Sequence, residues 1–240
     1  MPVTPFQLAK QPLDKDAYIW RYMSLSKFMS LLVTQNIYLS RVDLFSDPFE
    51  GASTQKNILL RKDLYKDKIP ENMLEQISLN FKIMPTWVYA NCWHKSDYES
   101  DYMWQKYGSV DGAIAIRSTY KNLIESIKGD CVIGMISYVT ENDFIPENNI
   151  LSRFFYKKKA FEHENEIRVL HWHPEFNGNL SVVNNDLGIT FPVNLMKLID
   201  SIYISPLSGN WFKNIVTDIL EKYSMNITVN DSQLSSNPVY

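Results

Sequence analysis

The sequence predicts an α+β protein built on a mixed, split β-sheet with flanking helices. Short segments rich in β-branched and aromatic residues recur along the chain, with stretches of helical periodicity between them. Helix and strand do not alternate strictly, which disfavours a doubly wound parallel sheet. The 240 residues, of which 45% are hydrophobic and 21% charged, suffice for one sizeable core. We expect an N-terminal arm over residues 1–17, a single α+β domain over 18–225 and a C-terminal tail over 226–240.

The first expected elements of the domain are a strand, a helix and a second strand. Residues 18–22 are rich in strand-forming side chains. Ser24 or Ser26 can cap a helix that runs to about Thr34. Residues 37–40 then form the second strand.

A turn and a long helical region are expected next. Within the turn at 43–51, Pro48 fixes its own φ angle and Gly51 ends the element. Residues 52–83 are polar and helical in pattern. The elements expected after residue 83 are strands at 87–93, 113–117, 131–139, 164–173 and 199–205, a short helix or turn at 97–107, and helices at 120–128 and 211–223.

Charge, cysteine content and missing motifs exclude several classes of protein. The formal net charge is −3, which argues against a protein that coats long nucleic acids but leaves room for a local basic site. Two cysteines cannot form a disulfide framework or a four-thiolate zinc site, and His171-Trp-His173 is too weak a pattern to predict a metal. The glycine-rich loops of dinucleotide and P-loop enzymes are missing, as are H-E-x-x-H and G-x-S-x-G.

The chain also carries no pattern typical of membrane insertion or export. No apolar run approaches the roughly 20 residues that span a bilayer. The first residues lack the basic-then-apolar order of a signal peptide. We therefore expect a cytoplasmic protein with no membrane partner.

The sharpest chemical signal is a pair of glutamates near residue 165. Side chains alternate along a strand, so Glu164, Glu166 and Arg168 are expected on one face. Paired carboxylates suit a reaction that develops positive charge, such as glycosidic cleavage through an oxocarbenium ion. One would stabilise the cation or activate the nucleophile, and the other would orient a hydroxyl. The alternative is an exposed strand edge, where Arg168 pairs with Glu166 at little energetic value.

A group of large side chains at helical spacing precedes this segment. Met103, Trp104 and Tyr107 most simply pack into the core. Alternatively they form an aromatic wall on which a base or nicotinamide ring stacks. Core packing is the simpler interpretation for Trp104, whereas both interpretations stay open for Tyr107.

Two runs of basic residues stand out in this acidic chain. Residues 153–159 interleave four basic side chains with three aromatic ones, directly before the paired glutamates, and could hold phosphates. The alternative is a solvated strand edge protected by lysines. The second run comprises Lys56, Arg61, Lys62, Lys66 and Lys68.

Several motifs, taken together, resemble a known family. They lie in chain order over about residues 18–220, at 20–22 (W-R-Y), 46–50 (S-D-P-F-E), 92–93 (C-W), 103–108 (M-W-Q-K-Y-G), 137–138 (S-Y) and 157–168 (K-x-x-x-F-x-x-E-x-E-I-R). This set resembles the bacterial domain-of-unknown-function family 2971. The chain departs from the family pattern at Ser46 (usually Asn), at Phe161 (usually Trp) and at Gln105-Lys106 (usually Ser or Ala, then His).

A more distant resemblance is to the ADP-ribosyltransferase superfamily. Arg21 on a first strand, Ser40 on a middle strand and Glu166 on a late strand are similar to the three functional positions of that fold. The resemblance implies an ADP-ribosyltransferase-like fold and cleavage of the N-glycosidic bond of NAD. Proteins of both families are common in bacterial conflict and phage-defence loci.

Together these observations predict an enzyme that cleaves an N–C1′ bond of a nucleotide. Glu166, Glu164 and Arg21 are the expected catalytic residues. The expected substrate-binding residues are Ser40, Asp47, Trp104, Tyr107, Lys157, Lys159 and Arg168.

Two substrates suit this chemistry, and a third possibility is not enzymatic. A DNA glycosylase acting on a modified base, with phage DNA as partner, stands narrowly first because the basic runs suit a polyanion. The alternative is an ADP-ribosyltransferase or NAD glycohydrolase, for which NAD is the substrate. No other cofactor is expected. A non-enzymatic binding or adaptor domain is the third possibility.

Overall fold

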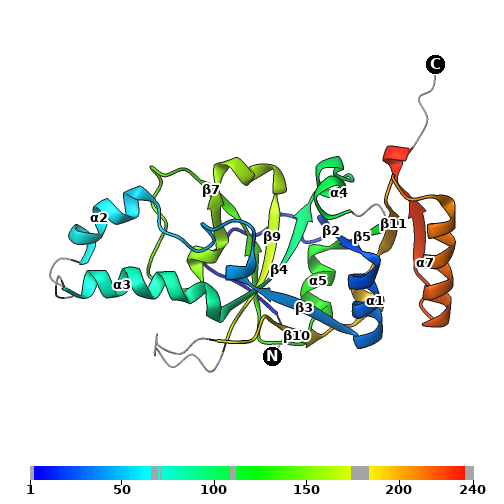
Figure 1. Ribbon diagram of the computed structural model, residues 1–240, viewed down its shortest axis with the longest axis horizontal. Coiled ribbons are helices and arrows are strands. Elements are labelled where there is room, and N and C mark those ends of the chain that lie inside the picture. Colours follow the sequence, from blue (N-terminus) through cyan, green and yellow to red (C-terminus); the bar gives the residue numbers. More distant parts are fainter. Residues whose placement is uncertain (1–2, 66–69, 71, 109–111, 174–183, 236–240) are drawn as a thin grey trace, which may run out of the picture.

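The computed structural model describes residues 3–65, 70, 72–108, 112–173 and 184–235. Helices flank a large β-sheet (Figure 1). The strands are β1 (Thr4–Pro5), β2 (Tyr18–Ser24), β3 (Asn36–Arg41), β4 (Val88–Lys95), β5 (Ala113–Thr119), β6 (Val132–Met135), β7 (Ser137–Val139), β8 (Tyr156–Lys158), β9 (Glu166–Trp172), β10 (Gly188–Pro192), β11 (Ser201–Ile204) and β12 (Thr228–Asp231).

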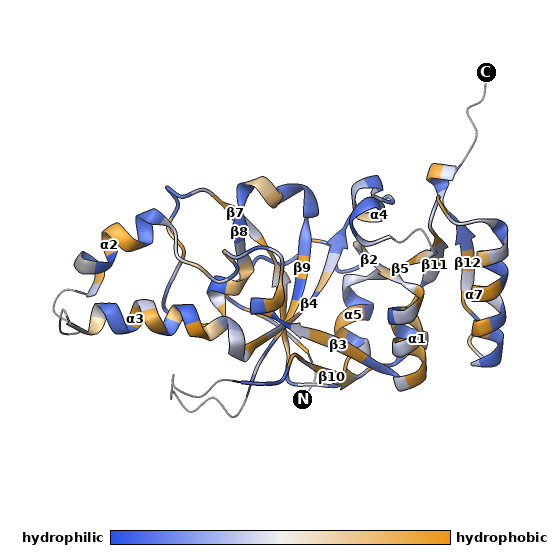
Figure 2. Cartoon of the chain, viewed as in Figure 1, coloured by the Kyte–Doolittle hydropathy of each residue, from blue (hydrophilic) through white to orange (hydrophobic). Residues whose placement is uncertain are grey.

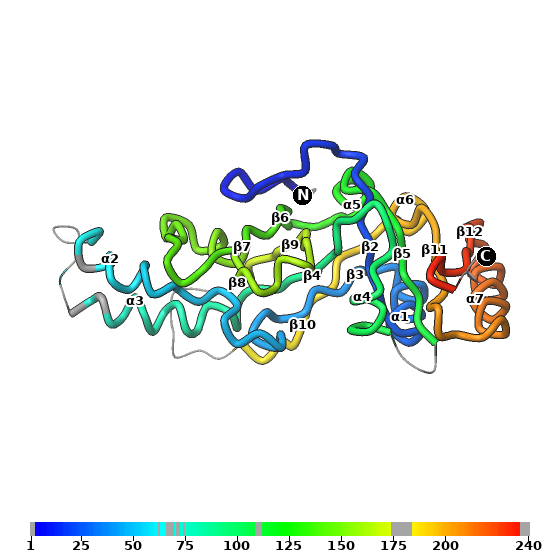
Figure 3. Tube along the Cα trace, turned by 90° about the horizontal axis from the view of Figure 1, so that it is seen from above, coloured from blue at the N-terminus to red at the C-terminus, as the bar shows by residue number. Residues whose placement is uncertain are grey.

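Helices of two kinds connect these strands. The α-helices are α1 (Leu25–Thr34), α2 (Gln55–Tyr65), α3 (Asn72–Ile83), α4 (Asp101–Tyr107), α5 (Tyr120–Ser126), α6 (Leu195–Leu198) and α7 (Asn210–Lys222). The 3₁₀ helices are η1 (Val42–Leu44), η2 (Met84–Trp87), η3 (Ser152–Phe155), η4 (Lys159–Glu164) and η5 (Gln233–Ser235). Helices α2 and α3 extend from one end of the molecule, and α7 lies at the other (Figures 1 and 3).

The large sheet is mixed and forks at β4. Its main path is β1-β6-β9-β4-β2-β5-β11-β12, while β3 pairs with β4 and β10 with β3. The pairs β1–β6 and β11–β12 are parallel, and the other pairs of this sheet are antiparallel. Strands β7 and β8 form a separate parallel pair. The predicted mixed, split sheet with flanking helices is confirmed.

The fork arises because two strands share one edge of β4. Strand β9 pairs with β4 along the other edge, from Val88 to His94. On the shared edge, β2 reaches only His94 and Lys95, and β3 reaches only Tyr89 and Ala90. Residues 91–93 therefore have no ladder partner on that side, and β2 and β3 diverge around them.

Apolar residues cover both faces of the sheet, but not evenly. One face packs against α1, α5, α6 and α7 through side chains such as Phe28, Leu123, Leu198 and Phe212. Figure 2 shows the apolar residues that recur along these strands and helices. The opposite face carries two separate apolar clusters, one with Ala90 and Leu170 and one around Trp20. The space between those clusters holds the polar residues described below.

Several boundaries differ from the predicted ones. The strand expected at 164–173 begins only at Glu166, because Asn165 adopts a left-handed backbone (φ 38°) that ends η4. The region expected as one strand at 131–139 is divided between β6 and β7. Strand β10 and helix α6 were not expected. The short or polar sequences of both give little periodic signal.

Both ends of the described chain take part in the sheet. Strand β1 pairs with β6, so the expected N-terminal arm is hydrogen-bonded to the sheet edge. The tail expected from residue 226 instead begins with β12, which pairs with β11. None of the described helices combines the length and apolarity needed to cross a membrane.

Candidate functional site

A cavity of about 750 Å³ lies at the fork of the sheet. Residues 20–23 of β2 and 90–94 of β4 line it together, because the two strands separate there. Ser40 of β3 and Asp47 of the turn after η1 also contribute. Crevices where strands of a sheet diverge are common ligand sites, so this cavity is the candidate functional site.

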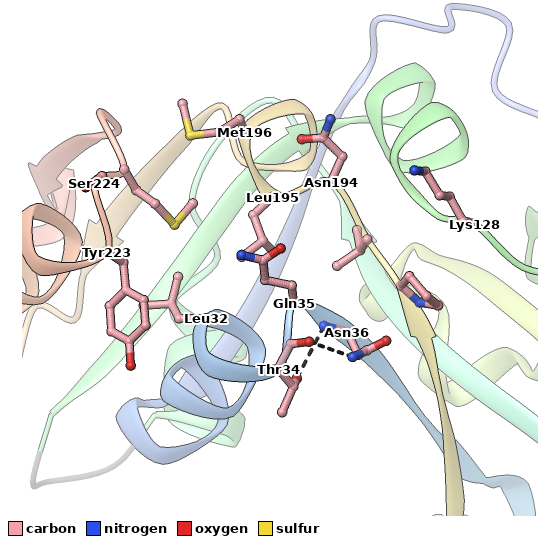
Figure 4. A pocket seen from close by; sticks show the side chains of 13 residues that line it. Leu32, Thr34, Gln35, Asn36, Lys128, Asn194, Leu195, Met196, Tyr223 and Ser224 are labelled. Carbon is pink, nitrogen blue, oxygen red and sulfur yellow. Dashed lines mark hydrogen bonds between the residues drawn. The ribbon is translucent and has the colours of Figure 1, made fainter.

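A second cavity of about 630 Å³ is lined by different kinds of side chain. It lies between the end of α1, helix α6 and the residues after α7, and Figure 4 shows its polar side chains, among them Gln35, Asn36, Asn194 and Lys128. Its lining contains no carboxylate. It therefore offers no carboxylate for acid, base or electrostatic catalysis.

Pairing across β4 and β9 places the polar residues of the first cavity. Cys92 lies opposite Arg168 and His94 lies opposite Glu166, so these four side chains share one face. They occupy the interval between the two apolar clusters on that face. The predicted common face of Glu166 and Arg168 is confirmed, but the predicted exposed edge is wrong because β9 lies between β4 and β6.

Arg168 is buried, and each of its three side-chain nitrogens is hydrogen-bonded to a neighbour. Its Nε donates to Glu166 Oε1 at 2.7 Å, and its two terminal nitrogens bind the Glu50 carboxylate at 2.8 and 3.0 Å. One of those nitrogens also donates to the Phe154 carbonyl at 2.9 Å. Arg168 was expected to bind substrate; it lies in the cavity lining, where it donates hydrogen bonds to Glu166, Glu50 and the Phe154 carbonyl.

Lys157 links three carboxylates in the same cavity. Its Nζ lies 2.6 Å from Glu164 Oε2 and 3.5 Å from both Glu50 and Glu166. Burial opposes its charge, but the carboxylates of Glu166 and Glu50 outweigh burial and raise the pKa of Lys157. Lys157 is therefore permanently cationic at neutral pH.

Glu164 reaches the cavity from η4 and not from the strand. Its Oε1 lies 2.5 Å from Lys106 Nζ, on α4, while Lys157 holds its other oxygen. The two predicted catalytic glutamates thus meet through Lys157, although Glu164 stands outside the strand that carries Glu166.

Glu166 is ionised despite its burial. Burial would raise the pKa of this carboxyl, but Arg168 and Lys157 outweigh that effect and hold its pKa at about 2. A carboxylate of this kind can stabilise a positive charge. It is too weak an acid–base group to carry a proton at neutral pH.

Arg21 faces the cavity without an acidic partner. Its guanidinium donates to the Cys92 carbonyl at 3.0 Å and lies 5.9 Å from the Trp93 ring. No described carboxylate forms an ion pair with it, and burial lowers its pKa. A desolvated cation without a counter-charge favours an anionic ligand.

Helix α4 brings one of the two expected aromatic residues to the cavity. Tyr107 is 42% exposed and lines the cavity beside Lys106. Trp104 points elsewhere: its indole donates to Glu99 at 3.0 Å and its ring packs edge-on against Tyr22. Trp104 is thus a core residue and offers no face for stacking.

Among the described residues of the basic runs, some are buried, while Lys56 and Lys159 are exposed. Arg153 is 2% exposed and packs over Phe81, while Arg61 is buried against Glu147. Lys159 stands outside the cavity lining and pairs with Glu162 at the surface. Lys66, Lys68 and the side chain of Lys62 lie outside the described residues.

Sequence reasoning missed several charged or titratable residues of the cavity, among them Glu50, Lys106 and His94. Glu50 lies in the S-D-P-F-E motif, which could have drawn attention to it. Lys106 stands where the resembling family has His. His94 follows Cys92-Trp93 but had no recognisable partner in the sequence. Only the fold brings these side chains to β9.

Comparison with protein-family models gives no match, and comparison with curated proteins gives none either. Within the part of the chain that the structure describes, no three His, Cys, Asp or Glu side chains are grouped so as to hold a metal ion. The geometry of the cavity is therefore the basis on which a function can be inferred.

Proposed function

We propose that the chain is an enzyme that cleaves the N-glycosidic bond of a nucleotide, with a small NAD-type dinucleotide as the substrate. The observation that carries the proposal is one cavity in which Glu166 is held ionised and Arg21 has no acidic partner. The first group suits a developing sugar cation and the second suits a phosphate. A cavity of about 750 Å³ is large enough for such a ligand.

The proposed reaction separates positive from negative charge across the cavity. Phosphate binds Arg21, and the base stacks on Tyr107. As the N–C1′ bond breaks, its electron pair leaves with the base and the ribose becomes oxocarbenium-like. Glu166 stabilises this cation, and Glu164 orients a ribose hydroxyl.

The ionised state of Glu166 favours a leaving group that needs no proton. Nicotinamide leaves NAD as a neutral base, so its departure requires no general acid. Arg168 and Lys157 keep Glu166 deprotonated, and it cannot supply one. Lys157 and Lys106 have raised pKa values and stay protonated, which disfavours either of them as the amine nucleophile of a Schiff-base route.

A base in DNA is the second candidate substrate, and one observation favours it. Phe49 is half exposed beside Lys158, in the same turn as the cavity residues Asp47 and Glu50. An exposed ring next to a cation can support a base flipped from a strand. The burial of Arg61 and Arg153 takes two of the described basic side chains away from the surface that such a substrate would use.

We also propose that the fold is similar to that of the ADP-ribosyltransferases. A mixed sheet that forks beside the cavity suits an ADP-ribosyltransferase-like fold. Arg21, Ser40 and Glu166 all line that cavity, as the resemblance to the superfamily implies. We include membership in family 2971, and a role in phage defence, in the same proposal.

Two parallel assays test the function. The protein is incubated with NAD and nicotinamide is measured by chromatography. It is also incubated with DNA carrying ordinary and modified bases, and abasic sites are scored by alkaline cleavage. Nicotinamide without abasic sites supports the proposal. Abasic sites alone make DNA the substrate. The absence of both products favours the non-enzymatic binding or adaptor domain.

A further inference from the structure

His94 is a buried histidine whose two ring nitrogens have different surroundings. It lies on β4 opposite Glu166 and lines the cavity. Its Nδ1 lies 2.6 Å from the backbone oxygen of Glu164. A carbonyl oxygen only accepts hydrogen bonds, so Nδ1 carries the proton.

The tautomer leaves the other nitrogen as a base. With the proton on Nδ1, Nε2 of His94 presents a lone pair. Hydrogen bonds among the described residues engage Nδ1 only. A hydrogen bond that fixes the proton on one ring nitrogen leaves the other nitrogen of a neutral imidazole able to accept a proton.

Other groups in the cavity are less suited to accept a proton. Glu166 is a weak base because Arg168 and Lys157 hold its charge. Glu164 is engaged at both oxygens by lysines. His94 alone, among the described cavity residues, combines a neutral side chain with an imidazole lone pair.

We propose that Nε2 of His94 is the general base that deprotonates an attacking water, which makes the enzyme a glycohydrolase and not a transferase. The inference rests on the proposed cleavage of the N-glycosidic bond. In the step, the water oxygen bonds to C1′ and the N–C1′ electron pair leaves with the base. One water proton passes to Nε2 and then to solvent.

The surroundings of His94 keep its imidazole neutral at neutral pH. The elements packed against His94 carry charged or imidazole side chains: Lys159, Glu162, His163 and Glu164 on η4, Glu166, Arg168 and His171 on β9, and Arg21 on β2. Burial lowers the pKa of His94, and the Glu164 backbone and carboxylate offset it only in part. The hydrolytic rate should therefore fall only as the pH drops below the ordinary histidine value of about 6.5.

The variant His94→Asn separates catalysis from structure. The asparagine amide can still donate to the Glu164 carbonyl, but it has no basic lone pair. We expect kcat for NAD hydrolysis to fall about 100-fold or more, with KM changed less than about threefold and the acidic limb of the pH profile lost. Added imidazole should restore part of the rate in His94→Gly.

A second histidine provides a matched control. His171 also places Nδ1 2.6 Å from a backbone oxygen, that of Asp130, but it lies outside the cavity lining. His171→Asn should keep the wild-type rate and pH profile. An equally active His94→Asn enzyme with an unchanged acidic limb would overturn the base assignment while leaving the proposed function intact.

The tautomer can be measured without any activity. Nitrogen-15 chemical shifts of the histidine rings should show His94 protonated at Nδ1 and unprotonated at Nε2 at pH 7. A proton on Nε2 would overturn the inference even in an inactive preparation. Wild-type protein that releases no nicotinamide, yet shows the expected tautomer, would contradict the proposed function first.

Discussion

At the scale of single residues, neighbouring charges give the two glutamates different chemistry. Glu166 is buried between Arg168 and Lys157, which keep it ionised. Glu164 forms ion pairs with two lysines, one of which, Lys106, lies on helix α4. In the proposed reaction Glu166 is the fixed negative charge that faces the sugar.

The lowered pKa of Glu166 predicts an acid-sensitive contribution to stability. Because its pKa is about 2 in the folded state and near 4.5 when unfolded, the contribution is complete above pH 4.5 and is lost as the pH falls toward 2. We expect Glu166→Gln to lower the unfolding free energy at pH 7 by about 3 kcal/mol and to flatten its dependence on pH below 4.5. Urea denaturation between pH 3 and 7 measures both effects.

The matched control for this change is a glutamate of the neighbouring 3₁₀ helix. Glu162 pairs with Lys159 in solvent, where both side chains are 56% exposed. Glu162→Gln should alter stability by less than about 1 kcal/mol. Equal effects of the two variants would contradict the buried charge network.

Arg21 should bind ligand without stabilising the fold. We expect Arg21→Gln to weaken nucleotide binding about 10- to 100-fold, because a charge-assisted contact to phosphate is lost. The unfolding free energy should not fall, because the variant removes a desolvated cation that has no acidic partner. Calorimetric titration with NAD and urea denaturation measure the two quantities, and unchanged affinity would contradict the phosphate assignment.

At the scale of elements, the turn before α2 holds Glu50 in place. The next residue, Gly51, has φ +71°, and a Cβ added there would lie 2.4 Å from the buried Phe154 ring. We expect Gly51→Ala to cost about 1–3 kcal/mol of unfolding free energy and to displace Glu50 from Arg168. The unfolding free energy, measured by urea denaturation, and the nucleotide affinity should both decline. A variant equal to wild type in both quantities would contradict this role for the turn.

Elements with a strong local pattern were predictable, and the contacts between them were not. Strand β2, helix α1 and helix α7 follow from strand-forming residues or helical periodicity. Strand β12 did not, because Thr-Val-Asn-Asp has little apolar content and gains its place by pairing with β11. Likewise Glu166 and Arg168 are neighbours in sequence, whereas Glu50 is 118 residues from Arg168 and Lys106 is 58 from Glu164.

At the scale of the whole molecule, many charged side chains lie in the cavity and not on the outer surface. The chain has a net charge of −3, yet the cavity lining carries five cationic side chains against four carboxylates. Most of these charges neutralise each other within the buried network. Among the described cations of the lining, Arg21 and Lys27 stand outside this network of ion pairs and are the contacts left for a phosphate.

Binding should accordingly depend weakly on salt. In a plot of log K against log salt concentration, each phosphate contact changes the slope by at most about one unit in magnitude. We therefore expect a slope between about −1 and −2 for a small nucleotide. A 20-nucleotide DNA strand should bind more weakly than NAD at physiological salt. Fluorescence anisotropy and calorimetry over a salt series measure this, and tight DNA binding with a slope steeper than about −4 would contradict it.

The most direct measurement is a proton NMR time course of NAD with the wild-type protein and with Glu166→Gln. The account predicts that wild-type protein converts NAD to nicotinamide and a ribose product with no strand of nucleic acid present. It predicts at least a 100-fold slower reaction for the variant in a folded state verified by its amide spectrum. Unchanged NAD after prolonged incubation, or equal rates for the two proteins, would contradict the claim that this cavity cleaves an N-glycosidic bond.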